Sequence, residues 1–148
     1  MSSIRRGTSI GMASLVLVLA GCGSGDGMDP NGQASAGTRP PIQGLQPTLA
    51  SIQDNVFTPI CTACHTGGGA PQGLQLDAGV SASKLINVPV PRDPNQIRVI
   101  PGDPDNSFLI HKLEGTQNIG QRMPFGGPFL DPSTIAVIRQ WIANGAPQ

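Results

Sequence analysis

Two cysteines and a histidine occupy a single five-residue run, Cys61-Thr62-Ala63-Cys64-His65. The chain holds three cysteines and two histidines in 148 residues, so chance would produce such a run about once in a thousand chains of this composition. Thiols three residues apart lie on one turn of a helix, and the imidazole follows directly. Any fold of this chain must therefore bring three chemically reactive groups to one place.

Four kinds of site use a Cys-x-x-Cys pair, and they differ in the other residues and elements that they require. A zinc site needs two ligands besides the two cysteines. Cys22 is expected to carry a lipid, His65 is crowded beside Cys64, and His111 is remote in the sequence. A thioredoxin-type disulfide opens a helix after a strand, and no strand is predicted before this motif. A structural disulfide is a third alternative in an exported protein. The complete run, C-x-x-C-H, is the attachment signature of c-type haem: Cys61 and Cys64 form thioethers, and His65 is the proximal iron ligand.

The distal iron ligand is predicted by elimination. Of four methionines, two lie in the leader and one in the tether described below, which leaves Met123 in the folded part. Met123 is flanked by an arginine and a proline, a poor context for a side chain that only fills space in a core. Cytochromes c commonly combine histidine with methionine. His111 is the alternative distal ligand, and an open five-coordinate iron is the third possibility.

Residues 1–21 have the form of a secretory signal peptide. Two arginines precede an uncharged, mostly apolar run over residues 10–20, which is too short to span a bilayer comfortably. The run ends in Leu19-Ala20-Gly21-Cys22, which resembles the lipobox of bacterial lipoproteins. That resemblance implies a lipidated Cys22 and an exported protein anchored to a membrane by its acyl chains. Under the sorting rule of such lipoproteins, Gly23 implies the outer membrane. Ordinary secretion with Cys22 as a free thiol is the alternative.

Residues 22–47 are predicted to form a flexible tether, because they are rich in Gly, Ser, Pro, Asn and Gln and show no helical or strand periodicity. Residues 48–148 leave room for one modest domain. Without the two leader arginines, seven basic residues face nine acidic ones. This mildly acidic balance gives no reason to expect nucleic-acid binding.

Three helices are predicted in the domain, over residues 49–60, 105–114 and 132–144. Apolar residues in the first recur at spacings of three and four, and Pro59 is expected to kink or end it. The second is predicted to begin after Asp103-Pro104 and end at Gly115, and the third to begin after the N-cap Asp131. Residues 66–73 and 88–101 are rich in Gly and Pro and are expected to be loops that wrap a bound cofactor.

Together these features resemble a class I, single-haem cytochrome c domain over residues 52–146. That family has an N-terminal helix running into C-x-x-C-H, a Met-bearing loop and a crossing C-terminal helix. Three further runs are similar to bacterial cytochrome c-like domains: Gly73-Leu74-Gln75-Leu76-Asp77, Pro101-Gly102-Asp103-Pro104 and Ile138-Arg139-Gln140-Trp141-Ile142. The resemblance implies an all-α fold of three to four helices with long loops around one covalent haem c. It also implies that Met123 is the distal ligand, and a backbone carbonyl is expected to orient His65.

The expected function is electron transfer and not enzymatic catalysis. A haem whose two axial positions are both filled has no vacancy for a substrate, so its iron changes only its valence. The expected partners are redox proteins that bind transiently, together with the membrane that holds the lipid. Two alternatives are an electron-entry or haem subunit of a larger membrane-associated oxidoreductase complex, and a haem sensor in which Met123 is a labile ligand.

Overall fold

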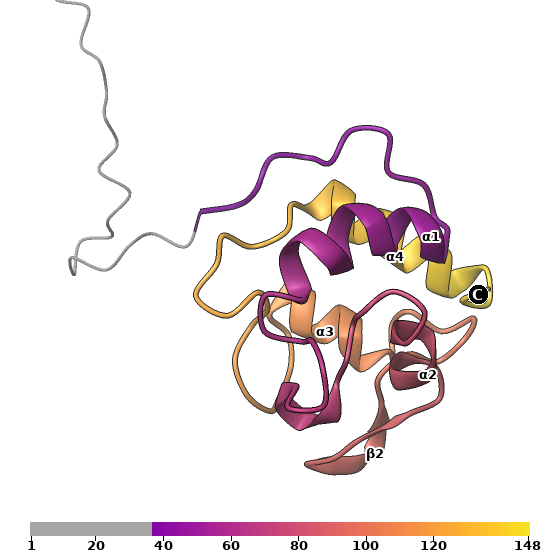
Figure 1. Cartoon of the computed structure of the whole chain (residues 1–148). Coiled ribbons are helices and arrows are strands. Elements are labelled where there is room, and N and C mark those ends of the chain that lie inside the picture. The colour runs from indigo at the N-terminus through magenta and orange to yellow at the C-terminus, as the bar shows by residue number, and fades with distance from the viewer. Residues whose placement is uncertain (1–36) are drawn as a thin grey trace, which may run out of the picture.

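The structure is a computed structural model, and it describes residues 37–148. The predicted signal peptide (residues 1–21), the lipidation site Cys22 and the predicted tether as far as residue 36 lie outside the described residues. The elements, in chain order (Figure 1), are α1 (Leu49–Ile52), η1 (Gln53–Cys61), η2 (Pro71–Gly73), α2 (Ser81–Leu85), β1 (Pro89–Val90), β2 (Asp93–Ile97), α3 (Phe108–Glu114) and α4 (Pro132–Ala143).

α1 and η1 form one continuous helix, called the long helix below, which ends at the first cysteine of the C-x-x-C-H run. The hydroxyl of Thr48 caps its start by accepting the N–H of Ser51 at 3.2 Å. η1 has the wider π-helical hydrogen bonding, and at its end the N–H of Thr62 donates to the carbonyl of Phe57 at 2.9 Å. Pro59 has no N–H to donate and would crowd a regular α-helical turn. The wider turns accommodate it, and the helix continues through Cys61.

α4 begins and ends as its sequence predicts. The carboxylate of Asp131 accepts the N–H groups of Ser133 at 2.8 Å and Thr134 at 3.1 Å, which are two of the unpaired donors at the helix start. Pro132 occupies the first helical position, where its missing N–H costs nothing. Gly145, with a φ of +93°, follows the last turn. The predicted N-cap and terminator of this helix are confirmed.

α3 is shorter than predicted. It begins at Phe108, after the N-cap Ser107, and not near residue 105. Asp103 does not cap it, because its carboxylate accepts the N–H of Asn106 at 3.1 Å and closes a separate turn. Gly115 ends the helix in the left-handed conformation with a φ of +84°, as its position predicts.

The predicted all-α fold class is wrong, because the described residues also contain an antiparallel two-stranded sheet. β1 and β2 pair through Pro89 with Ile97 and Val90 with Asp93, with an irregularity in the register between the two pairs. The fold is therefore mixed α/β. Closely spaced prolines in this segment hide the strand signal in the sequence. A two-stranded ribbon tolerates them, since both of its strands are edges and an edge strand can spare a donor.

The described part of the chain packs from residue 37 onward, earlier than the domain boundary expected at Thr48. Phe129 donates its N–H to the carbonyl of Gly37 at 2.8 Å and accepts the N–H of Arg39 at 2.7 Å. Leu45 is buried in the core. Residues 37–39 therefore pair with the segment between α3 and α4.

One hydrophobic cluster, called the core cluster below, joins the long helix to α3 and α4. Trp141 and Ile138 of α4 have no exposed surface, and neither does Ile52 of α1. α3 packs against α4. In Figure 1, α4 crosses behind the long helix and α3 lies below it. Within residues 37–148, no helix is long and apolar enough to cross a membrane.

Candidate cofactor site

The C-x-x-C-H run forms a tight turn at the end of η1. The carbonyl of Cys61 accepts the N–H of His65 at 2.8 Å and that of Cys64 at 3.2 Å. This bonding gathers the two sulfurs and the imidazole on one turn, as the spacing predicts. Cys61 is partly buried against the core cluster, Cys64 is exposed, and both are free thiols.

The imidazole of His65 is held in one tautomer. Its Nδ1 lies 3.0 Å from the carbonyl oxygen of Leu74, nine residues later. A carbonyl can only accept, so Nδ1 carries the proton and Nε2 keeps its lone pair. Burial lowers the pKa of His65; the hydrogen bond to Leu74 opposes this effect and the charge of Arg98 adds to it. The ring is therefore neutral at neutral pH, with Nε2 available to a metal.

The loop that supplies the Leu74 carbonyl is tied at its base. The carbonyl of His65 accepts the N–H of Leu76 at 2.8 Å. The carboxylate of Asp77 accepts the hydroxyl of Thr66 at 2.5 Å and the N–H of Gly67 at 3.0 Å. Both bonds lower the pKa of Asp77, and the bond from Thr66 has the larger effect. The carboxylate is thus ionised at neutral pH. Its two bonds close the loop that contains the Leu74 carbonyl, the acceptor for the His65 ring.

A buried amide connects this loop to the long helix. Gln53, 5% exposed, donates from Nε2 to the carbonyl of Leu76 at 2.8 Å and to the hydroxyl of Thr58 at 3.0 Å. Its Oε1 accepts the hydroxyl of Ser81 at 2.6 Å. One side chain therefore fixes the distance between the helix that carries the cysteines and the loop that orients the histidine.

Two guanidinium groups lie near the sulfur and imidazole donors. Burial raises the pKa of the Cys61 thiol to about 12, and the positive charge of Arg39 limits this rise. The Nε of Arg39 is buried and has no hydrogen-bond partner in the described structure. Arg98 is 7% exposed and donates to the carbonyls of Lys84 and Gln72 at 2.7 and 2.6 Å. Within residues 37–148, neither arginine forms an ion pair with a carboxylate.

Met123 lies in the segment between α3 and α4, which is anchored to α3. Its N–H donates to the carbonyl of Lys112 at 2.8 Å, and Nε of the neighbouring Arg122 donates to the carbonyl of Leu113 at 2.9 Å. The guanidinium of Arg122 also stacks on the ring of Phe129, 4.1 Å from its centroid. The Met123 side chain is partly buried against the core cluster that Cys61 also contacts. Both therefore border one apolar interior.

His111, the alternative distal ligand, lies in different surroundings. It is on α3, where its Nδ1 lies 2.9 Å from the hydroxyl oxygen of Thr116. It lines a shallow hollow of about 190 Å³ whose other lining residues are Gln96, Thr116, Gln117 and Asn118. No member of the C-x-x-C-H run borders this hollow, so the structure does not bring His111 to His65.

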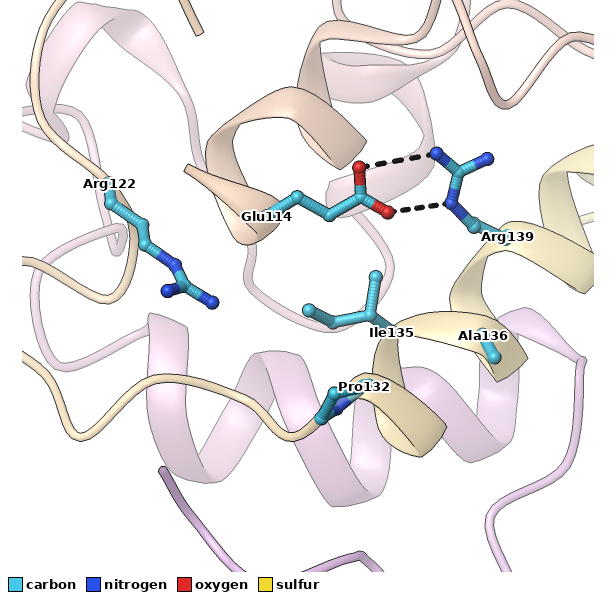
Figure 2. A pocket seen from close by; sticks show the side chains of 6 residues that line it. All are labelled: Glu114, Arg122, Pro132, Ile135, Ala136 and Arg139. Atoms are coloured by element: carbon cyan, nitrogen blue, oxygen red, sulfur yellow. Dashed lines mark hydrogen bonds and ion pairs between the residues drawn. The ribbon is translucent and has the colours of Figure 1, made fainter. Parts of the chain in front are cut away.

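A second hollow, of about 230 Å³, lies between α3, α4 and Arg122 (Figure 2). Glu114 and Arg139 form a two-pronged ion pair at one side, with distances of 2.8 and 3.2 Å, and Arg139 also contacts Asp105 at 2.5 Å. The pair links α3 to α4. The hollow contains none of the predicted haem-site residues, and in the described residues no three His, Cys, Asp or Glu side chains gather as a metal site.

The donor set fits a covalently attached haem. Two free thiols are available for thioether bonds, and an imidazole of fixed tautomer presents Nε2 for iron. Arg39 provides positive charge near the Cys61 thiol and has a buried Nε without a hydrogen-bond partner in the described structure, which suits a cofactor that carries two propionates.

Sequence reasoning did not identify Leu74, Gln53, Arg39 or Arg98. Leu74 acts through its backbone, which leaves no signature in the sequence, and the other three become informative only when the fold shows their neighbours. Comparison of the chain with protein-family models, curated proteins and solved structures gave no match.

Proposed function

We propose that this protein carries electrons by means of one covalently bound c-type haem. Cys61 and Cys64 provide the thioether sulfurs, His65 is the proximal ligand and Met123 the distal ligand. In this proposal the domain is related to single-haem cytochromes c and works as a carrier between redox partner proteins.

The observation that carries the proposal is the hydrogen bond from His65 Nδ1 to the Leu74 carbonyl. Metal-binding histidines usually donate their second ring N–H to a carbonyl or carboxylate, which fixes the ring and makes the ligating nitrogen more basic. Here that arrangement occurs inside a C-x-x-C-H run with two free thiols. A disulfide would not require it, and a structural zinc site would need a fourth ligand besides Cys61, Cys64 and His65.

The remaining roles follow from the chemistry of the side chains. A haem with histidine and methionine ligands takes up and releases one electron at the iron, and the methionine sulfur favours the reduced state. Asp77 and Gln53 keep the Leu74 carbonyl against the ring. The bonds that anchor the Met123 segment to α3 keep its thioether close to the core cluster.

We further propose that the protein is exported and is held at the outer membrane by a lipid on Cys22. The support is the Leu-Ala-Gly-Cys run at the end of the leader. Labelling with a radioactive fatty acid tests this directly: the wild-type chain is expected to incorporate the label and a Cys22→Ser variant is not.

The haem site is tested by expressing the protein together with haem-attachment machinery. We expect the absorption spectrum of a low-spin c-type haem, with a weak methionine-to-iron band near the red end of the ferric spectrum. The Met123→Ala variant is expected to keep its covalent haem but lose that band and bind carbon monoxide readily. His111→Ala is the matched control and should keep the wild-type spectrum.

A wild-type band that survives in Met123→Ala but disappears in His111→Ala would reverse the assignment of the distal ligand. Rapid carbon monoxide binding by the untreated wild-type ferrous protein would favour a sensor with a labile distal ligand over an electron carrier.

A further inference from the structure

Arg98 is a buried cation whose charge has no carboxylate partner within residues 37–148. Only 7% of its surface is exposed, and it follows β2 (Asp93–Ile97) directly. Its two terminal nitrogens donate to the carbonyls of Lys84 and Gln72 at 2.7 and 2.6 Å. Carbonyl oxygens stabilise a guanidinium by hydrogen bonding, but they carry no net negative charge and leave its positive charge uncancelled.

The same contact brings this charge close enough to the proximal imidazole to help lower its pKa. Arg98 binds the carbonyl of Gln72, and the carbonyl two residues further along, that of Leu74, accepts the ring N–H of His65. Gln72 adopts a left-handed backbone conformation, with a φ of +58°, which turns the chain between these contacts. The guanidinium and the imidazole therefore bond to carbonyls two residues apart in the same short loop.

We propose that Arg98 raises the reduction potential of the centre by keeping an unneutralised positive charge beside the proximal ligand. The proposal rests on the haem site described above. When a one-electron donor reduces the centre, the centre takes up one electron and its net charge falls by one unit. A fixed positive charge nearby favours the less positive, reduced state, and burial keeps solvent and salt from screening that charge.

The alternative role for Arg98 is purely mechanical, as a fork that pins the loop. Charge and geometry can be separated by substitution. Arg98→Met removes both, Arg98→Gln removes the charge but keeps one donor group, and Arg98→Lys keeps the charge but loses the two-pronged geometry. Arg92→Met is the matched control, because it removes the same formal charge from an exposed side chain.

The experiment is a spectroscopic redox titration of the haem-loaded proteins, with urea denaturation of each variant alongside. Arg98→Met and Arg98→Gln are expected to lower the equilibrium constant for reduction at least threefold, about 30 mV for a one-electron couple. Arg98→Lys and Arg92→Met are expected to change it less than twofold. If Arg98→Met does not mature, the comparison of Arg98→Gln with Arg98→Lys carries the same test.

Two results would overturn the proposal while leaving the haem site intact: equal shifts in Arg98→Met and Arg92→Met, or a shift in Arg98→Lys as large as that in Arg98→Gln. A wild-type protein without covalent haem would instead overturn the proposed function. The presence or absence of haem in the wild type therefore shows which of the two has failed.

Discussion

The buried amide of Gln53 provides a sharp test of how the site is supported. In a Gln53→Met variant, a side chain of similar length fills the space but forms no hydrogen bonds. Two groups lose their Gln53 partner in the interior: the carbonyl of Leu76, bonded at 2.8 Å, and the hydroxyl of Ser81, bonded at 2.6 Å. An unsatisfied buried polar group costs about 1–3 kcal/mol, so the expected loss of unfolding free energy for the two groups is about 2–6 kcal/mol. Against a typical total of about 5–15 kcal/mol, such a loss is readily measured.

The assay is urea denaturation of the haem-loaded protein, followed by circular dichroism. Gln140→Met is the matched control, because Gln140 is exposed and bonds only Asn144, at 2.8 Å, on the helix surface. We expect the control to change stability by less than about 0.5 kcal/mol. If Gln53→Met were as stable as Gln140→Met, the reasoning that this amide holds the histidine loop against the helix would be refuted.

Two further positions give independent predictions. Asp131→Ala removes the N-cap of α4 and is expected to cost about 1–2 kcal/mol in urea denaturation at neutral pH. Burial raises the pKa of Asp131, but hydrogen bonds from the first helical turn outweigh burial and lower it from the ordinary 3.8. The stability that the variant lacks relative to wild type should therefore be fully missing above pH 3.8, and the difference should shrink as the pH falls below it. A difference that grew as the pH fell would contradict this prediction. Gly115→Ala should lower the thermal midpoint, because φ is +84° and the new Cβ would lie 2.8 Å from Cδ of Arg122. Gly68→Ala is its control, with nothing within 4 Å of the new Cβ, and equal midpoints for the two variants would contradict the prediction.

Local signals in the sequence were sufficient to predict α4 and the end of α3. Asp131, Pro132 and Gly145 act within one or two turns of their own position, so their effect can be read without the rest of the fold. The C-x-x-C-H turn is equally local, since its spacing alone places the three groups on one turn.

Long-range pairing is what the sequence could not supply. The β1–β2 ribbon depends on backbone pairing in a proline-rich segment, and the pairing of residues 37–39 depends on Phe129, far along the chain. The partner of the His65 ring is a main-chain carbonyl that any residue at position 74 would provide. From the sequence alone, Arg98 would be expected on the surface, and only the fold shows that it is buried.

The central claim is that two sulfurs fix one haem next to the imidazole of His65. Intact-mass spectrometry of the protein, produced with haem-attachment machinery and fully denatured, tests this claim most directly. The account predicts that the wild-type chain is heavier than the Cys61→Ala/Cys64→Ala chain by one haem in addition to the mass of the two substitutions. A mass difference that the two substitutions alone explain would contradict it.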